Sequence, residues 1–382
     1  MRLFGLDRFV RVLYFVYVRH EYIEPFKKET ESMKRAISLM LNLEQRIAGM
    51  LAGVKIGDRW GLPPETMTRQ QIFKRTNGRG VMGLEDVTQW RTRLEGLVPY
   101  GTSDDWQQHF AMTVICIEDP EFRPSSAAKG FVDAGRVGMA GWGGTSIVAH
   151  TAVALWLETG GLSGRDPAVP PARPVHEGAG CGCGVAIRIS SLGVLAVFRD
   201  WDESELIRRA LEHGKLTHPD PRAWVGGAAI ALATYRIMLG QFPTQPREWL
   251  VSLADTLEPY EQAEIAAYGG LSAAAPRVCQ RLRLAAQHLD HLDDLISLVG
   301  NTCPTYESVP FALAVFLRNL GNFEAGILEA INAGGDTDSV ASMAGSLLGA
   351  YLGYDDIPKH MLMPEDDDVC LLAKRFHDRY VS

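Results

Sequence analysis

A long uncharged stretch behind two aspartates constrains the fold of this chain more than any other part of its sequence. Residues 332–353 read NAGGDTDSVASMAGSLLGAYLG, and no residue from Ser339 to Tyr354 is charged. Small and apolar residues over that length predict a deeply buried helix. Asp336 and Asp338 lie at its start, where an unpaired charge beside apolar neighbours is costly. The stretch therefore predicts a helical core with two carboxylates at its edge that need a partner.

Helical patterns recur along the rest of the chain, whereas runs that alternate apolar and polar residues are scarce. The stretch from Leu43 onwards contains small residues that permit close contact with another helix, namely Ala48, Gly49, Ala52 and Gly53. Further helices are expected over residues 104–119, 223–239, 308–320 and 323–333. These patterns predict one all-α domain over residues 43–382. A basic and aromatic extension over residues 1–42, which we expect to be helical, precedes it.

Composition narrows the class of protein. The chain has 382 residues, of which 46% are hydrophobic and 22% are charged, as in globular proteins and unlike disordered or fibrous ones. The formal net charge of -8 argues against a nucleic-acid backbone as the main partner. No feature of the sequence indicates an oligomeric state.

The six cysteines are few and irregularly spaced, which argues against a disulfide framework and favours a reducing compartment. We therefore expect a cytoplasmic protein. Only Cys181 and Cys183 lie close together in sequence, and such a pair without a second ligand cluster is weak evidence for zinc. Two long uncharged stretches, Val137–Leu157 and Ser339–Tyr354, contain too much glycine and polar residue for membrane spans, and both are expected to be buried helices.

Two acidic clusters stand out as candidates for chemistry. Ser103, Asp104 and Asp105 open one expected helix, and Asp336, Asp338 and Ser339 open another. Two independent N-caps would explain one such residue in each cluster. Hard oxygen ligands for Mg²⁺, Mn²⁺ or Ca²⁺ would explain all of them. If the clusters converge, two unit charges about 4 Å apart repel by roughly 4 kcal/mol at a dielectric of 20, and a cation reverses that repulsion. The residues alone leave both alternatives open.

Several motifs together resemble the ADP-ribosylglycohydrolase family. In chain order they are RIAGMLAGVKIGDRWGLPPE, SDD, GVAIRIS, LTHPDP, NTCPTYESVPFALAVFL and INAGGDTDSVASMAGSLLGA, which together extend over roughly residues 43 to 355. The resemblance implies a compact all-α, orthogonal multi-helix bundle with two Mg²⁺ ions in an acidic cleft, Mn²⁺ being an alternative. It also implies cleavage of the bond between ribose C1″ and an acceptor.

The same resemblance implies roles for particular residues. The implied metal ligands are Ser103, Asp104, Asp105, Asp336, Asp338 and Ser339. Either Glu65 or Asp105 is the implied proton acceptor. The implied contacts to ADP-ribose are Cys183, Gly184, His218, Asn301, Thr302 and Trp106. Trp106 replaces a threonine that is usual in the family and Cys183 replaces an asparagine, while the carboxylates are intact, so the motifs do not indicate which acceptor is used.

The sequence thus predicts a Mg²⁺-dependent hydrolase acting on an ADP-ribosylated protein side chain, nucleic acid or small molecule. A nucleic acid enters this prediction only as a modified substrate. One alternative is an N-ribosidase acting on a free nucleoside or nucleotide, with Trp106 stacked on the base. Another is a catalytically silent module that binds ADP-ribose, although so many carboxylates argue against a pure binder.

Overall fold

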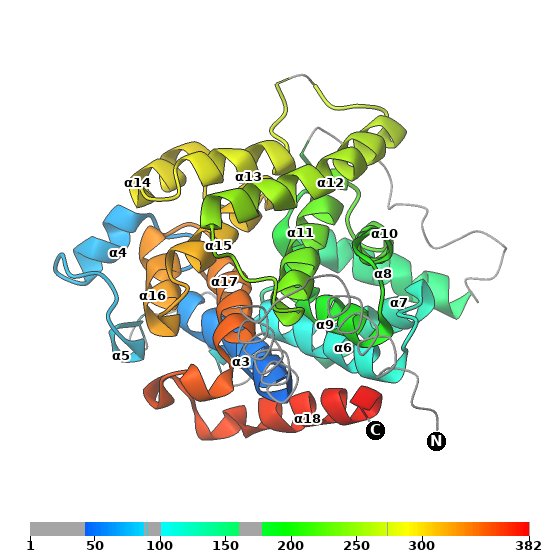
Figure 1. The fold of residues 1–382 in the computed structure, drawn as a ribbon, viewed down its shortest axis with the longest axis horizontal. Coiled ribbons are helices and arrows are strands. Elements are labelled where there is room, and N and C mark those ends of the chain that lie inside the picture. Colours follow the sequence, from blue (N-terminus) through cyan, green and yellow to red (C-terminus); the bar gives the residue numbers. More distant parts are fainter. Residues whose placement is uncertain (1–42, 88–89, 91–100, 160–177, 273, 382) are drawn as a thin grey trace, which may run out of the picture. The chain divides into compact units, whose positions relative to one another are not determined.

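The computed structural model describes residues 43–87, 90, 101–159, 178–272 and 274–381 (Figure 1). The predicted extension over residues 1–42 lies outside this part of the chain. The first described helices are α3 (Leu43–Gly61), α4 (Arg69–Arg75), α5 (Leu84–Val87), α6 (Asp104–Glu118), α7 (Pro124–Val137) and α8 (Gly144–Glu158). The central ones are η2 (Cys183–Arg188), α9 (Ser190–Arg199), α10 (Glu203–Lys215), α11 (Pro221–Met238) and α12 (Pro246–Tyr268). The remainder are α13 (Val278–Gln287), α14 (Leu292–Asp294), η3 (Leu295–Val299), α15 (Thr305–Arg318), α16 (Phe323–Ala333), α17 (Thr337–Leu352), η4 (Tyr354–Asp356), η5 (Lys359–Met361), η6 (Pro364–Asp366) and α18 (Asp367–Val381).

The predicted all-α class is confirmed. Within the described residues, extended pairing is limited to two isolated bridges, Thr68 with Gly334 and Gly182 with Pro304. Helix α11 is the centre of the core, because every one of its residues is buried and it contacts α9, α10, α12, α15 and α17. Helix α17 is buried from Thr337 to Ala350, as its uncharged sequence predicted. A helix that is apolar on all sides needs such a complete cover of other helices.

Helices α3 and α17 pack through their backbones along a row of small residues. A side chain added at Gly49, Gly53 or Gly57 would place its Cβ 2.3, 2.0 or 2.3 Å from a backbone atom of α17. The hydroxyls of Thr337 and Ser342 donate to carbonyl oxygens of α3, at 2.6 and 3.2 Å. The glycines recur every four residues and therefore share one face of α3. This packing confirms the predicted close helix contact, and it places the C-terminal end of α3 beside the N-terminal end of α17.

Substitution of Gly53 by alanine is expected to destabilise the protein, although alanine favours helix more than glycine does. The added Cβ would meet the Gly345 carbonyl of α17, and overpacking of this kind typically costs about 1–3 kcal/mol. Urea unfolding measures the loss. Gly321→Ala is the control, because no atom lies within 4 Å of the Cβ that it adds. A Gly53→Ala protein as stable as the parent would contradict the backbone contact.

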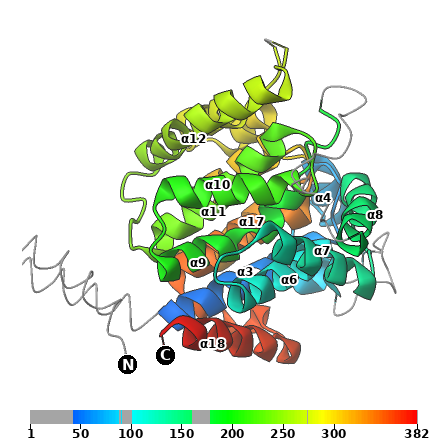
Figure 2. The same ribbon diagram turned by 90° about the vertical axis from the view of Figure 1, so that its right-hand side faces the viewer.

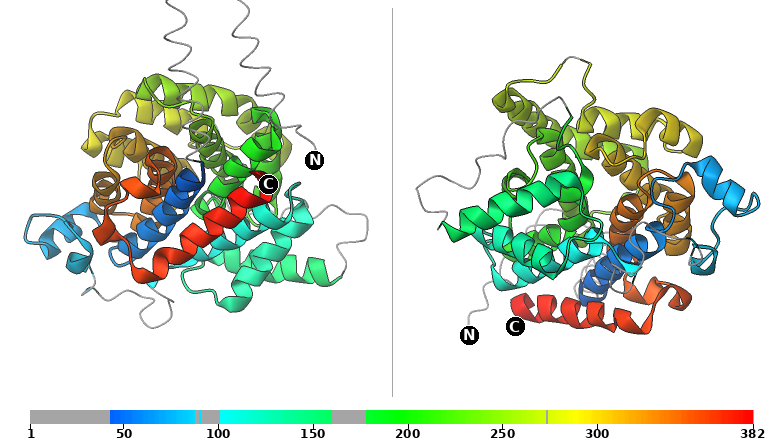
Figure 3. Two further views of the ribbon diagram at one scale, coloured as in Figure 1. Left: turned by 60° about the horizontal axis from the view of Figure 1, so that its bottom comes forward. Right: turned by 180° about the vertical axis from the view of Figure 1, so that it is seen from behind.

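Helix α18 lies along α3 and α6 (Figures 2 and 3). The buried Arg59 of α3 donates to both carboxylate oxygens of the buried Asp366, at 2.9 and 2.6 Å. Lys55 of α3 lies 3.2 Å from Asp366 and 2.8 Å from Asp368. Such paired and hydrogen-bonded charges are the form in which buried ions are tolerated. They hold the last helix against the helix whose end reaches the site described below.

One predicted buried helix is wrong. The stretch from Val137 to Leu157 is divided between the end of α7, a connection and α8. Only Ser146, Ala149 and Val153 of α8 are buried, while Val148 is 66% exposed. The absence of charge reflected small and apolar residues on a peripheral helix rather than a core position. None of the described helices is both long enough and apolar enough to cross a membrane.

Candidate metal and substrate site

Asp58 of α3 organises the beginning of α6. Its carboxylate is fully buried and accepts hydrogen bonds from the backbone N–H groups of Ser103 and Trp106, at 2.7 and 3.0 Å for Oδ2. A carboxylate that accepts from the first turn of a helix satisfies N–H groups that lack partners within the helix. Asp58 thereby fixes the direction in which Asp104 and Asp105 leave α6. The sequence analysis did not single it out, and its only signal was one carboxylate within a small-residue helix.

The glycine pair before Asp336 allows a close backbone crossing. Gly334 and Gly335 have φ of 76° and 83°, and a Cβ would lie 2.6 Å from Arg69 N and 2.4 Å from Asn301 O, respectively. Both the left-handed conformation and the crowding require glycine. The Asn301 side-chain amide donates to the backbone carbonyls of Ala333 and Gly334. The backbone carbonyl of Asn301 accepts from Asp336 N. Asn301 therefore holds the Asp336 loop.

Glu65 is tied to the same loop. Thr66 N donates to Gly335 O and Gly335 N donates to Met67 O, both at 2.8 Å. The two prolines before Glu65 restrict the local backbone further. The half-buried Glu65 carboxylate thus faces the start of α17.

The carboxylates converge. Ligand oxygens of Asp58, Asp105 and Asp338 lie within 4.8 Å of one another, and so do those of Glu65, Asp336 and Asp338. Asp336 occupies the N-cap position of α17, yet its side chain makes no capping hydrogen bond. Ser103 does cap α6 by accepting from Asp105 N. The two acidic clusters are therefore one site rather than two independent caps.

The carboxylates line one part of a cavity of about 380 Å³. Glu65, Asp104, Asp105, Asp336, Asp338 and Ser339 form its acidic part. Its remaining wall is rich in glycine and includes the start of α8 and the loop that leads into η2, with Cys183, Gly184 and His218. A Cβ at Gly184 would lie 3.0 Å from His218 Cε1, so glycine is needed for the two to approach. The cavity thus joins an acidic end to a wall of exposed backbone.

Burial makes this cluster unusually basic. Desolvation, followed by the neighbouring carboxylates, raises the pKa of Asp104 to about 8 and the pKa values of Asp105 and Asp338 well above the ordinary range. Desolvation also raises the pKa of Asp58 to about 6, although the hydrogen bonds that Asp58 accepts from backbone N–H groups act to lower it. Asp105 Oδ1 is buried without any hydrogen-bond partner. An orphaned oxygen among crowded carboxylates is the environment that a bound cation would satisfy.

In the presence of a chelator, the free energy of unfolding is expected to fall as the pH rises from about 3.8 to about 8. The folded-state pKa of Asp104 lies above its ordinary value of 3.8, so its contribution is present below the unfolded pKa and is lost as pH passes the folded pKa. One such group contributes a slope of at most about 1.4 kcal/mol per pH unit. Urea unfolding in EDTA measures this slope, which Asp104→Asn should reduce. Stability that increases with pH would contradict the assignment.

A buried arginine connects the acidic end to His218. Arg188 donates to Gln108, His213 and Thr217, at 2.7, 2.9 and 2.6 Å, and Gln108 in turn donates to Asp104 at 2.9 Å. Thr217 Oγ1 lies 2.9 Å from His218 Nδ1. Desolvation, then Arg188, lowers the pKa of His218 to about 3. His218 is therefore neutral at neutral pH and offers a hydrogen bond to a ligand rather than a charge.

Three of the predicted substrate contacts lie elsewhere. Asn301 supports the Asp336 loop, and the exposed Thr302 donates to Glu307 at 2.5 Å; neither lines the cavity. Trp106 lines a neighbouring, mostly apolar cavity of about 600 Å³, where Lys55 Nζ lies 5.3 Å from its ring centroid. Successive helix residues point about 100° apart, so Trp106 lies about 200° around α6 from Asp104 and faces away from it.

Replacement of Trp106 by threonine is expected to lower stability rather than alter the acidic site. The side chain is 9% exposed and contacts His109 and Phe110 as well as Lys55. Truncation of a buried tryptophan typically costs about 3–5 kcal/mol. Urea unfolding measures the loss, and the more exposed Phe110, replaced by alanine, serves as a milder control. A stable Trp106→Thr protein with altered substrate preference would place Trp106 at the substrate after all.

Comparison with known proteins agrees with this fold. "ADP-ribosylhydrolase ARH3" of Xenopus tropicalis is 31% identical over 205 residues, which cover 49% of this chain and 57% of that protein. The human protein of that name is 28% identical over 205 residues, 50% of this chain and 55% of that one. The chain thus spans little more than half the length of these relatives. The uncharacterized protein YegU of Escherichia coli K12 is 26% identical over 331 residues, 82% of this chain and 89% of that one.

The class defined by these features is an all-helical protein with carboxylates gathered at helix ends. A solved structure of an "ADP-ribosylglycohydrolase-related protein complex" has this fold, with a TM-score of 0.59 and 20% identity over 89% of this chain and 99% of that one. The ADP-ribosylglycohydrolase family profile matches residues 40–382. This chain belongs to the ADP-ribosylglycohydrolase family, as its motifs predicted.

Proposed function

We propose that the protein is a Mg²⁺-dependent hydrolase that cleaves the bond between ribose C1″ and the acceptor of an ADP-ribosylated substrate. One observation carries the proposal: carboxylates from α3, α6, the start of α17 and the Glu65 loop gather in two groups that share Asp338, and Asp105 in one of these groups has an oxygen without a hydrogen-bond partner. The carboxylates of Glu65, Asp104, Asp105, Asp336 and Asp338 line one end of a cavity whose other walls are rich in glycine. Family membership supports the same reaction.

The donor set fits Mg²⁺, with Mn²⁺ as an alternative. The converging groups are carboxylates, which hard cations prefer, and their mutual repulsion favours a divalent ion. We propose that Asp104, Asp105, Asp336 and Asp338 hold two ions, and that Asp58 belongs to the same set. When bound, Mg²⁺ supplies Lewis-acid chemistry that orients ribose hydroxyls and favours attack by water at C1″.

The chain's own groups would move the protons. Glu65 is half-buried beside Asp336 and Asp338, and we propose that it takes a proton from the attacking water and returns it to the departing acceptor. Asp105 is the alternative base. The products are then free ADP-ribose and the protonated acceptor. Dense negative charge at the site also stabilises an oxocarbenium-like sugar in the transition state.

The glycine wall suits a diphosphate. Helix α8 starts at the cavity, and its N-cap Gly143 offers no side-chain capping bond. Its first N–H groups are therefore available to an anion, to which the helix dipole adds attraction. The neutral His218 supplies a hydrogen bond nearby. A substrate with phosphate at one end and ribose at the other would match the two ends of this cavity.

A substrate screen tests the proposal. Peptides ADP-ribosylated on serine or arginine, ADP-ribosylated DNA and free nucleotides are incubated with the protein in Mg²⁺ or in EDTA, and released ADP-ribose is measured. Release is expected only with Mg²⁺. ADP-ribose binding without turnover of any substrate would instead indicate a binding module, and cleavage of a free nucleoside would indicate an N-ribosidase.

The free cysteines of the described chain are consistent with the reducing cytoplasm that we propose as its location.

A further inference from the structure

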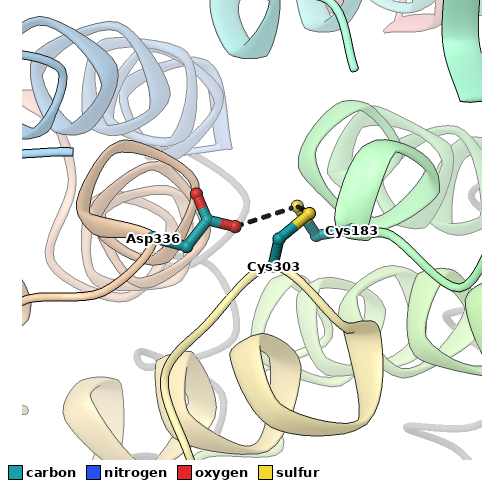
Figure 4. Close-up of side chains that lie close together, drawn as sticks. All are labelled: Cys183, Cys303 and Asp336. Atoms are coloured by element: carbon teal, nitrogen blue, oxygen red, sulfur yellow. Dashed lines mark hydrogen bonds between the residues drawn. The ribbon is translucent and has the colours of Figure 1, made fainter. Parts of the chain in front are cut away.

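Two cysteines that are far apart in sequence meet beside Asp336. Cys183 Sγ lies 3.9 Å from Cys303 Sγ and 3.3 Å from Asp336 Oδ2. Figure 4 shows the two sulfur atoms side by side, with the Asp336 carboxylate facing them. Ligand atoms of all three residues lie within 4.8 Å of one another. Cys183 is buried and Cys303 is exposed, and both line the cavity described above.

These distances match a tetrahedral site for a thiophilic metal. With bonds of about 2.3 Å to sulfur and about 2.1 Å to oxygen, tetrahedral zinc separates two sulfurs by about 3.8 Å and sulfur from oxygen by about 3.6 Å. The observed separations of 3.9 and 3.3 Å are close to these values. A disulfide would instead require the sulfurs to approach to about 2.05 Å. The two distances from Cys183 are therefore close to those between ligands of a tetrahedral metal, and the third pair, Cys303 and Asp336, lies within 4.8 Å.

The backbone holds both cysteines in place. Gly182 and Pro304, which adjoin Cys183 and Cys303, form an isolated bridge. Thr305 N donates to Cys181 O at 2.8 Å, and Thr305 Oγ1 donates to Gly182 O at 2.6 Å. Asp336 is fixed by Asn301 through its backbone N–H. Ligands held by their own backbones need little reordering when a metal binds, which favours affinity.

We propose that Cys183, Cys303 and Asp336 form a second metal site, which takes one thiophilic divalent cation of the Zn²⁺ class. Binding releases the two thiol protons to the buffer and forms two metal–sulfur bonds and one metal–oxygen bond. The exposed side of Cys303 leaves the fourth position to water. The pair of sulfur ligands is Cys183 and Cys303, not the pair Cys181 and Cys183 that is adjacent in sequence. Cys303 comes from the loop before α15.

The site shares Asp336 with the proposed Mg²⁺ centre. A cation held by the two sulfurs would draw on the same carboxylate, so Zn²⁺ is expected to inhibit hydrolysis by weakening Mg²⁺ binding. This consequence, unlike metal binding itself, rests on the proposed function. The two are separable because sulfur ligation has its own spectroscopic signature.

Cobalt substitution tests the site. The full chain, freed of metal and kept reduced with a phosphine, is titrated with Co²⁺ while the sulfur-to-cobalt charge-transfer absorption is recorded. Zn²⁺ affinity is then measured by competition with a chromophoric chelator. We expect one equivalent of Co²⁺ to produce the band and one equivalent of Zn²⁺ to abolish it. Cys303→Ser should remove the band and weaken Zn²⁺ binding by at least about 100-fold, since even supporting residues of metal sites contribute 10–100-fold.

Two controls keep the result interpretable. Cys370→Ser removes a thiol on α18 that belongs to no ligand cluster among the described residues, and it should bind like the parent. Stabilisation by Mg²⁺, measured by melting, should persist in Cys303→Ser, which shows that the variant folds. Absence of a sulfur band in the reduced parent, or its persistence in Cys303→Ser, would overturn the proposal. Loss of Mg²⁺ stabilisation in the parent, with the sulfur band intact, would count against the hydrolase alone.

Discussion

Asp338→Asn protein is expected to lose both its stabilisation by Mg²⁺ and nearly all turnover. Asp338 lies within 4.8 Å of Asp58 and Asp105 on one side and of Glu65 and Asp336 on the other, so it belongs to both carboxylate groups. A ligand that is present at 100 times its dissociation constant stabilises the fold by about 2.7 kcal/mol, and this gain should vanish. Turnover should fall on the order of a thousandfold, because several kcal/mol of charge stabilisation are lost.

The same substitution should make the metal-free protein more stable. It removes one buried carboxyl group whose charged form is disfavoured, because desolvation and then Asp336 and Glu65 raise its pKa, and asparagine preserves the shape of the side chain. Melting curves in EDTA and in Mg²⁺ measure both effects. Asp355→Asn, at an exposed carboxylate, is the control and should behave like the parent in both buffers. Superimposable EDTA and Mg²⁺ curves for the parent would contradict a metal site.

The second large effect is expected for Glu65→Gln. Glutamine keeps the size and hydrogen-bonding reach of glutamate but removes its basicity, so turnover should fall by roughly two to four orders of magnitude. ADP-ribose affinity should change far less, because the glycine wall and the metal ligands of α6 and α17 remain. Turnover and equilibrium binding of ADP-ribose are the two measurements.

Glu365→Gln provides the matched control, since it makes the same chemical change at an exposed position. Its turnover should equal that of the parent. If Glu65→Gln retained full turnover, Glu65 would leave the mechanism and Asp105 would become the base. If instead ADP-ribose affinity fell as far as turnover did, Glu65 would be a binding residue, and its link to Gly335 through Thr66 would explain the effect.

Local sequence patterns were sufficient for the helices that carry the site. The stretch from Leu43 to Gly61 is α3, and the expected helix over 104–119 is α6 within one residue. Their apolar spacing and their acidic first turns are properties of neighbouring residues, which a sequence displays directly. The glycine pair before Asp336 was also visible, although its reason, a backbone crossing against Asn301 and Arg69, was not.

The sequence by itself determined the helical class, the family motifs and the two acidic clusters, because each of these depends on residues within a few turns of one another. Only the tertiary structure decided which side chains meet. Asp58 belongs to the carboxylate cluster because α3 packs closely on α17 through its glycines. Trp106 lines a different cavity from the carboxylates. The tertiary structure also joined Cys183 to Cys303 through a backbone bridge across 120 positions. Such encounters depend on helix rotation and on packing between distant segments, and neither leaves a periodic trace in the chain.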